Sequence, residues 1–266
     1  MIRKGVHEPT IEDLVEISGI ETLHPGGVAL TKRTAELAHL KTGIRVLDVS
    51  CGRGTQAIYY AQEFGADVIG IDISENMIAA ATENARRAGV NGKAVFKLGD
   101  AQNLPFEDNT FDAVINECAV GIPDDSQSVV NEMVRVAKYK GTIAIHESTW
   151  RKDIPEKEKD DLSERYGTTP LEFEEWMSML AGAGVRNIVS EFDKWSKPEM
   201  FWNIRKDREV EHFSKVLTWP ERISTTFRVF RKYGITGLLK AFENEKVFYR
   251  AVLDGKIGYC LFKGEK

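Results

Sequence analysis

The sequence has few cysteines, no long apolar run and no excess of basic charge. Its 266 residues include three cysteines, Cys51, Cys118 and Cys260, which lie far apart without a Cys-x-x-Cys or Cys/His pattern. This spacing predicts neither a disulfide framework nor a metal site, and it fits a reducing compartment. No apolar run reaches the roughly 18 residues of a membrane span, and the first nine residues are too polar for a signal peptide. We therefore expect a cytoplasmic protein without stable membrane insertion.

The charge balance excludes one class of partner. Lys and Arg number 36 against 41 Asp and Glu, which gives a net charge of -5. Such a balance disfavours the broad cationic surface that duplex nucleic acid requires. With 42% hydrophobic residues, the chain can bury a core as one large domain or two small ones. We expect a small-molecule partner, no nucleic acid, and a monomer or homodimer.

Runs of strand length alternate with amphipathic segments of helix length in the first two thirds of the chain. Helices are predicted over 28–40, 55–64 and 74–88 and from about 125, and strands over 45–49, 67–72, 94–98, 111–116 and 142–147. This alternation is typical of crossover connections in a parallel α/β sheet.

The last third of the chain is less regular. Thr169-Pro170-Leu171-Glu172 forms a capping-box pattern that predicts a helix to about Ala183, and strands are predicted over 185–195 and 257–263. About sixty residues of helical character separate these strands. We interpret residues 196–256 as a helical cap inserted in a domain made of residues 1–195 and 257–266.

The helical cap has an aromatic and mildly basic composition. The segment 194–256 contains 14 Lys and Arg against 8 Asp and Glu, and a stripe of Phe227, Phe230, Tyr233 and Phe242 is interleaved with Arg228, Arg231 and Lys232. Packing on the sheet domain is the usual explanation of such a stripe. A surface for a membrane or an amphiphilic ligand is the alternative.

A glycine-rich turn follows the first predicted strand. Val-Leu-Asp-Val-Ser leads into Cys51-Gly52-Arg53-Gly54, and the next strand ends at Asp72. A glycine turn before a helix admits a ligand to backbone N–H groups, and an acid at the next strand end can accept ribose hydroxyls. Gly52-x-Gly54-x-x-Ala57 also fits a dinucleotide fingerprint, so a nicotinamide-dependent reductase is one alternative. Asp48 opposes it, because a carboxylate there repels pyrophosphate and attracts an ammonium group.

Four motifs occur in one order: VLDVSCGRG, GIDIS, GDAQNLPFEDNTFDAVI and EMVRVAKYKGTIAI. Over about residues 20–195 the chain resembles class I S-adenosylmethionine-dependent methyltransferases of the small-molecule type. The resemblance implies a Rossmann-like seven-stranded sheet of order 3-2-1-4-5-7-6, with the last strand antiparallel. It also implies S-adenosylmethionine as cofactor and S-adenosylhomocysteine as product. One departure is Ser50, which stands where the family usually has glycine.

The resemblance also implies individual roles. Asp72 binds the ribose, Ile73 covers the adenine, and Asp100 with Ala101 reads the adenine edge. His24-Pro25-Gly26-Gly27 corresponds to a lid segment over the cofactor. The full predicted cofactor set is Gly27, Asp48, Ser50, Cys51, Gly52, Asp72, Ile73, Met77, Asp100, Ala101 and Glu117.

Candidate catalytic residues follow the fourth and fifth strands, because ligands bind at the carboxyl edge of such sheets. They are Glu117, which is also expected to contact the cofactor's ammonium group, and His146. We predict in-line methyl transfer to a small molecule, in which alignment matters most and a general base is optional. A non-catalytic cofactor-binding sensor or partner subunit is the main alternative. Cys118 suggests arsenite methylation, but the sequence lacks the further cysteines that would hold arsenic.

Overall fold

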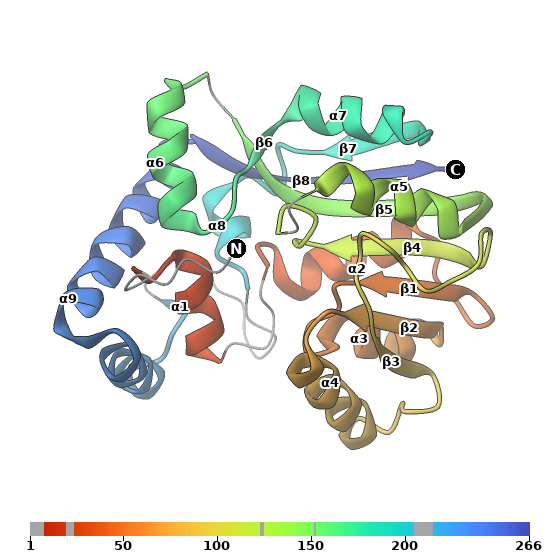
Figure 1. Ribbon diagram of the computed structural model, residues 1–266, viewed down its shortest axis with the longest axis horizontal. Coiled ribbons are helices and arrows are strands. Elements are labelled where there is room, and N and C mark those ends of the chain that lie inside the picture. The colour runs from red at the N-terminus through yellow and green to blue at the C-terminus, as the bar shows by residue number, and fades with distance from the viewer. Residues whose placement is uncertain (1–7, 20–23, 123–124, 152, 205–214) are drawn as a thin grey trace.

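A mixed sheet forms the centre of the molecule (Figure 1). The computed structural model describes residues 8–19, 24–122, 125–151, 153–204 and 215–266. Its strands are β1 (Arg45–Val49), β2 (Asp67–Asp72), β3 (Ala94–Leu98), β4 (Phe111–Glu117), β5 (Ala137–Trp150), β6 (Leu171–Glu172), β7 (Arg186–Glu191) and β8 (Ile257–Glu265).

The strand order is β3-β2-β1-β4-β5-β8-β7, and the two-residue β6 pairs with β5 outside this path. Strands β1 to β5 pair with one another in parallel, whereas β8 runs antiparallel to both β5 and β7. The predicted order 3-2-1-4-5-7-6 with an antiparallel last strand is therefore confirmed, because β7 and β8 are the sixth and seventh predicted strands.

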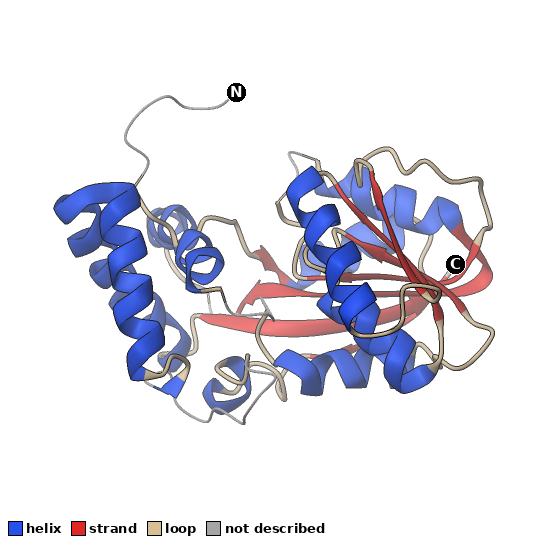
Figure 2. Cartoon of the chain, turned by 90° about the horizontal axis from the view of Figure 1, so that it is seen from below, coloured by secondary structure: helices blue, strands red, loops and turns tan. Residues whose placement is uncertain are grey.

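Helices cover both faces of the sheet (Figure 2). They are α1 (Ile11–Ser18), α2 (Gly27–Leu37), α3 (Thr55–Phe64), α4 (Glu75–Arg87), α5 (Ser126–Val136), α6 (Glu156–Tyr166), α7 (Phe173–Gly182), α8 (Pro198–Phe201) and α9 (Trp219–Leu253). Successive strand residues point to opposite faces. Leu47 and Val49 of β1 accordingly join the core with α5 and α7, and Val46 joins the core with α2 and α3.

A third core links the cap to the far ends of β5 and β8. It contains Trp150 and Tyr259 from these strands, Phe201 from α8 and Phe248 from α9. Ile11 of α1 and residues of α6 belong to the same core. We call α1, α6, α8 and α9 the helical group. Two of its members, α1 and α6, lie outside residues 196–256. Figure 1 shows α1, α6 and α9 together beyond the carboxyl ends of the parallel strands.

Two local predictions are corrected. The helix predicted from Thr169 begins at Phe173, with Glu172 as N-cap in a capping box with Glu175. Residues 171–172 instead pair with β5, and this strand pairing overrides the local capping pattern. The strand predicted over 185–195 ends at Glu191. In contrast, the helices predicted from 74 and from about 125 begin there, and Ser74 and Asp125 cap them, each accepting a hydrogen bond from a backbone N–H three residues later.

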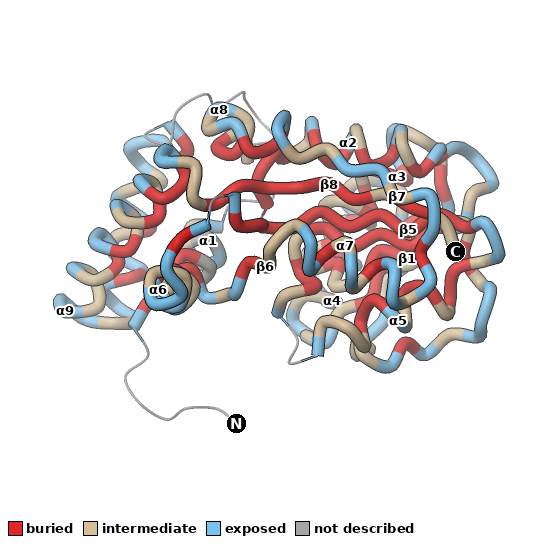
Figure 3. Tube along the Cα trace, turned by 90° about the horizontal axis from the view of Figure 1, so that it is seen from above, coloured by how far each residue is buried: buried red, intermediate tan, exposed pale blue. Residues whose placement is uncertain are grey.

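The aromatic stripe of α9 does not pack on the sheet domain. Phe227, Phe230 and Phe242 are 63%, 47% and 51% exposed, so packing is the wrong explanation for these rings. Buried and exposed stretches alternate along α9 (Figure 3). The helix is interrupted at Gly234, whose φ of 71° and ψ of -170° are not helical. Within the described ranges, no helix combines the length and the apolar character needed to cross a bilayer.

Candidate active site

The turn after β1 requires unusual backbone conformations. Ser50, Gly52 and Gly54 all have positive φ, at 59°, 52° and 76°. A side chain at Gly54 would collide with the ring of Phe96, whereas Gly52 faces open space. Ser50 adopts the left-handed conformation that a glycine would occupy at lower cost. The backbone of the turn is thus accessible from the cavity at Gly52, while at Gly54 the turn packs tightly against Phe96.

Asp72 joins this turn to the next helix. Its Oδ2 accepts a hydrogen bond from Gly52 N and its Oδ1 accepts one from Ser74 N, both at 2.9 Å. Ser74 caps α4 through Met77 N. One carboxylate therefore fixes two loops at the carboxyl edge of the sheet.

Asp48 is a buried carboxylate whose Oδ2 has no hydrogen-bond partner in the part of the chain that the structure describes. It is 2% exposed and lines the cavity described below. Burial and the nearby charges of Glu117 and Asp72 raise its pKa well above the ordinary value. A buried carboxylate of this kind is ionised at low cost only beside a positive charge, and the ammonium group of S-adenosylmethionine can supply that charge. The residues present therefore fit this cofactor.

One cavity of about 1430 Å³ extends from this turn to the helical group. Residues of the predicted cofactor set that line it are Asp48, Ser50, Cys51, Gly52, Asp72, Met77 and Glu117. Aromatic residues at its other end are Trp150 at the end of β5 and Tyr166, Phe201, Trp202 and Phe248 of the helical segments. A typical ligand pocket measures about 300–1000 Å³, so this cavity has room for more than one molecule.

Other predicted site residues do not line the cavity. Ile73 is 74% exposed, and Asp100 and Ala101 follow β3 at the same sheet edge. His146 is fully buried and lies behind Glu117, so its placement does not support direct contact with an acceptor. Gly27 lies against the insertion, because a built Cβ would be 2.3 Å from the carbonyl oxygen of Asn203.

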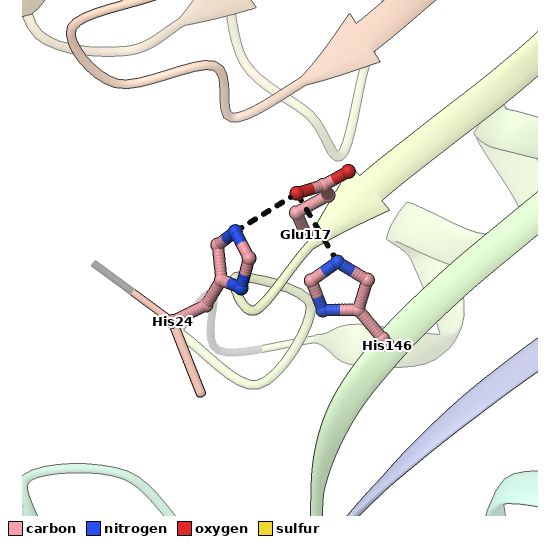
Figure 4. Close-up of side chains that lie close together, drawn as sticks. All are labelled: His24, Glu117 and His146. Atoms are coloured by element: carbon pink, nitrogen blue, oxygen red, sulfur yellow. Dashed lines mark ion pairs between the residues drawn. The ribbon is translucent and has the colours of Figure 1, made fainter. Parts of the chain in front are cut away.

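Glu117 is the centre of a buried polar cluster (Figure 4). His24 Nε2 lies 3.0 Å and His146 Nε2 3.2 Å from its Oε2. Thr31 Oγ1 donates to the same oxygen at 2.8 Å, and the Tyr60 hydroxyl donates to Oε1. The lid motif predicted a position for His24 near the cofactor, and His24 does line the cavity. No sequence signal indicated Thr31 or Tyr60, which lie on helices far away in the chain.

The cluster keeps Glu117 ionised. Burial favours the neutral acid, but the imidazoles of His146 and His24 hold the pKa of Glu117 well below its ordinary value. Because both carboxylate oxygens already accept hydrogen bonds, Glu117 is poorly placed to remove a proton from an acceptor.

Cys51 and Cys260 are buried and unsuited to thiolate chemistry, whereas Cys118 is half-buried and lines the cavity without a second such cysteine. Burial raises the pKa of Cys51 and of Cys260 well above the ordinary value. Soft metalloids are bound by thiolates, so the structure gives the arsenite alternative no support.

The sequence matches a known protein family. A family model described as a methyltransferase domain matches residues 40–195. The chain belongs to this methyltransferase family. The predicted resemblance to class I S-adenosylmethionine-dependent methyltransferases is thereby confirmed.

Two relatives illustrate the similarity of the methyltransferase to known proteins. Methyltransferase GfsG of Streptomyces halstedii is 36% identical over 129 residues, which are 48% of this chain and 46% of the relative. Phosphoethanolamine N-methyltransferase 1 of Arabidopsis thaliana is 28% identical over 190 residues, 71% of this chain and 37% of the relative. The chain thus spans less than half the length of these relatives.

The fold also matches a solved structure. A putative sarcosine dimethylglycine methyltransferase from Galdieria sulphuraria superposes with a TM-score of 0.73 at 19% identity. The match covers 90% of this chain and 83% of that chain. At this identity the likeness concerns the fold alone.

Proposed function

We propose that this methyltransferase transfers a methyl group from S-adenosylmethionine to a bulky, largely apolar small molecule. The observation that carries the proposal is the single cavity that joins the glycine turn after β1 to the aromatic end of the helical group. A site for donor and acceptor in one enclosure fulfils the main requirement of in-line displacement, which is alignment of the two reactants.

The residues at the donor end bind and orient the cofactor in this proposal. Asp72 accepts ribose hydroxyls, and Asp48 supplies the counter-charge for the ammonium group. The backbone of the turn at Gly52 lies against the methionine part, because this glycine leaves open space. The cofactor, when bound, supplies a methyl group that its sulfonium has already activated. The protein therefore needs to hold the acceptor on the far side of the methyl carbon and to exclude water.

The acceptor end suggests an amphiphilic molecule. Trp202 and Phe248 are about 5% exposed and give this end apolar walls. The hydroxyls of Ser163 and Thr225 also line the cavity, and each is a buried atom without a hydrogen-bond partner in the described part of the chain. Buried hydroxyls without partners are costly, so a polar group of the acceptor is expected to pair with them.

The proposal is tested with labelled S-adenosylmethionine and a series of alcohols and amines with growing aromatic or alkyl bodies. We expect methylated product from the larger members, with one S-adenosylhomocysteine released per product. Thr225→Val should raise the KM for the acceptor, whereas the control Ser224→Ala changes an exposed neighbouring hydroxyl and should have no effect. Tight S-adenosylhomocysteine binding without turnover of any acceptor would instead indicate a cofactor-binding sensor.

A further inference from the structure

The cluster around Glu117 brings together three metal-binding side chains from separate parts of the chain. His24 precedes α2, Glu117 ends β4, and His146 lies within β5. One ligand atom of each lies within 4.8 Å of the others. The cysteine spacing predicted no metal site. That prediction does not bear on this cluster, because none of its three members is a cysteine.

The hydrogen bonds of the two histidines assign their protons. His24 Nδ1 lies 2.9 Å from the carbonyl oxygen of Pro25, which can only accept, so Nδ1 carries a proton. His146 Nδ1 lies 2.8 Å from the Tyr259 hydroxyl, which itself donates to the His146 carbonyl oxygen. This hydroxyl therefore accepts from His146 Nδ1. In the neutral form of both rings, the lone pair is left on Nε2. His24 Nε2 also lies 3.3 Å from Thr31 Oγ1, which donates its own hydrogen to Glu117, so a hydrogen bond to this hydroxyl requires a proton on Nε2 and belongs to the protonated form of the ring.

The two Nε2 lone pairs and an anionic oxygen thus face one another at 3.0 and 3.2 Å. Such an arrangement is repulsive unless a cation lies between them. His146 Nε2 is completely buried and, although close to Glu117, makes no hydrogen bond within the described structure. A proton on each ring is one way to supply positive charge, and a metal ion is the other.

The spacing suits a metal ion. Two ligands that lie about 2.0–2.2 Å from one ion at about 90–109° are about 2.8–3.6 Å apart. Both nitrogen–oxygen distances fall in this range. The outer contacts also match those of metal sites, in which ligating histidines donate their other N–H to a carbonyl or similar group and carboxylates accept further hydrogen bonds. Pro25 and Tyr259 serve the histidines in this way, and Tyr60 serves Glu117.

We propose that His24, Glu117 and His146 form a site for a divalent transition metal ion of the zinc type. Two imidazoles and one carboxylate favour such ions over Mg²⁺, which prefers oxygen ligands. His24 and Glu117 line the cavity, so the remaining coordination position faces it and is open to water or to an acceptor oxygen. This last role rests on the proposed methyl transfer, but the metal site itself does not.

Metal titration of the full chain tests the proposal. After removal of metals with a chelator, we expect Zn²⁺ to bind at about one equivalent in calorimetry and elemental analysis, and Mg²⁺ not to bind. Co²⁺ should give a visible absorption spectrum of a low-symmetry site. His24→Ala and His146→Asn should each weaken Zn²⁺ binding at least about tenfold.

His39 provides the matched control. It is exposed and, like His24, precedes β1 in the sequence, but it does not belong to the cluster. His39→Ala should bind Zn²⁺ as the wild type does. The proposal is wrong if His39→Ala loses the zinc, or if the wild type binds none at micromolar concentrations. In the second case, protonated imidazole rings supply the positive charge beside Glu117. Because S-adenosylhomocysteine binding is measured separately on the metal-free protein, this failure is distinct from failure of the proposed methyl transfer.

Discussion

Single carboxylates control the donor end of the cavity. Asp72 accepts hydrogen bonds from two backbone N–H groups and lines the cavity. Asp48, in contrast, has one oxygen that finds no hydrogen-bond partner among the described residues. These two acids should therefore respond differently to substitution.

Asp72→Ala should weaken S-adenosylhomocysteine binding by about 2–4 kcal/mol, because charge-assisted hydrogen bonds to the ribose are lost. Calorimetry measures this. Asp67→Ala removes an exposed acid at the other end of the same strand and should leave the affinity unchanged. Equal affinities of the wild type and a folded Asp72→Ala variant would show that the motifs have been assigned incorrectly.

Asp48→Asn should increase stability and decrease cofactor affinity. The pKa of Asp48 is raised in the folded state, so its contribution to stability is full below the unfolded value of about 3.8 and is lost as the pH rises. At pH 7 the neutral amide should raise the free energy of unfolding by at least about 1 kcal/mol. Denaturation curves at pH 3.5 and 7 check this, since the gain should vanish at the lower pH. A gain of equal size at both pH values would contradict the assigned cause.

At the scale of elements, the turn before α2 connects the cofactor side to the cap. His24 contacts Glu117, while Gly26 N donates to the carbonyl oxygen of Met200 at 3.1 Å. Gly27 packs against Asn203. The predicted lid segment therefore lies between the sheet and the insertion.

Gly27→Ala should place a Cβ against the carbonyl oxygen of Asn203 in addition to straining a positive φ of 47°. We expect it to lower the free energy of unfolding by about 1–3 kcal/mol more than Gly43→Ala. Gly43 also has a positive φ, but its Cβ would meet nothing within 4 Å. Chemical denaturation compares the two variants, and equal losses would mean that the contact with the insertion is unimportant.

Two aromatic residues of the insertion serve to test the role of the cap. Trp202 is 5% exposed and lines the cavity, whereas Phe230 on α9 is 47% exposed and does not. Trp202→Ala should impair acceptor turnover while S-adenosylhomocysteine affinity stays within a few-fold of wild type. Phe230→Ala should change neither, because its ring is exposed and lies outside the cavity lining. Parallel loss of affinity and turnover in Trp202→Ala would argue against a separate acceptor end.

At the scale of the whole molecule, the sheet and the helical group share a core. Trp150 of β5 and Tyr259 of β8 pack with Phe201 and Phe248, so the helices are not attached by a linker alone. We infer that the two parts unfold together.

S-adenosylhomocysteine at 100 times its Kd should therefore raise the free energy of unfolding by about 2.7 kcal/mol for the whole molecule. The unfolding midpoints from far-UV circular dichroism and from tryptophan fluorescence should shift by the same amount. The fluorescence of Trp150, Trp195 and Trp202 reports on the core that contains the helical group. Two separate transitions, with only one sensitive to the ligand, would show that the parts are independent.

The sequence by itself determined the parallel sheet, its strand order through the family resemblance, and the donor turn. These features depend on neighbours in the chain: alternation of apolar runs, glycines at positions of positive φ, and an acid at the next strand end. The helix cap at Thr169 was predicted wrongly, because the local pattern carries no information about the pairing of residues 171–172 with β5.

Only the tertiary structure decided the interior of the site. His24, Tyr60, Glu117 and His146 come from four distant segments, and their meeting follows from how α2 and α3 pack on β4 and β5. The direction of the α9 aromatics was likewise undetermined, because a helical period fixes which residues share a face but not which face meets the core. Burial and contact between distant segments are properties of the packed molecule, so the cavity and the charge cluster within it required the fold.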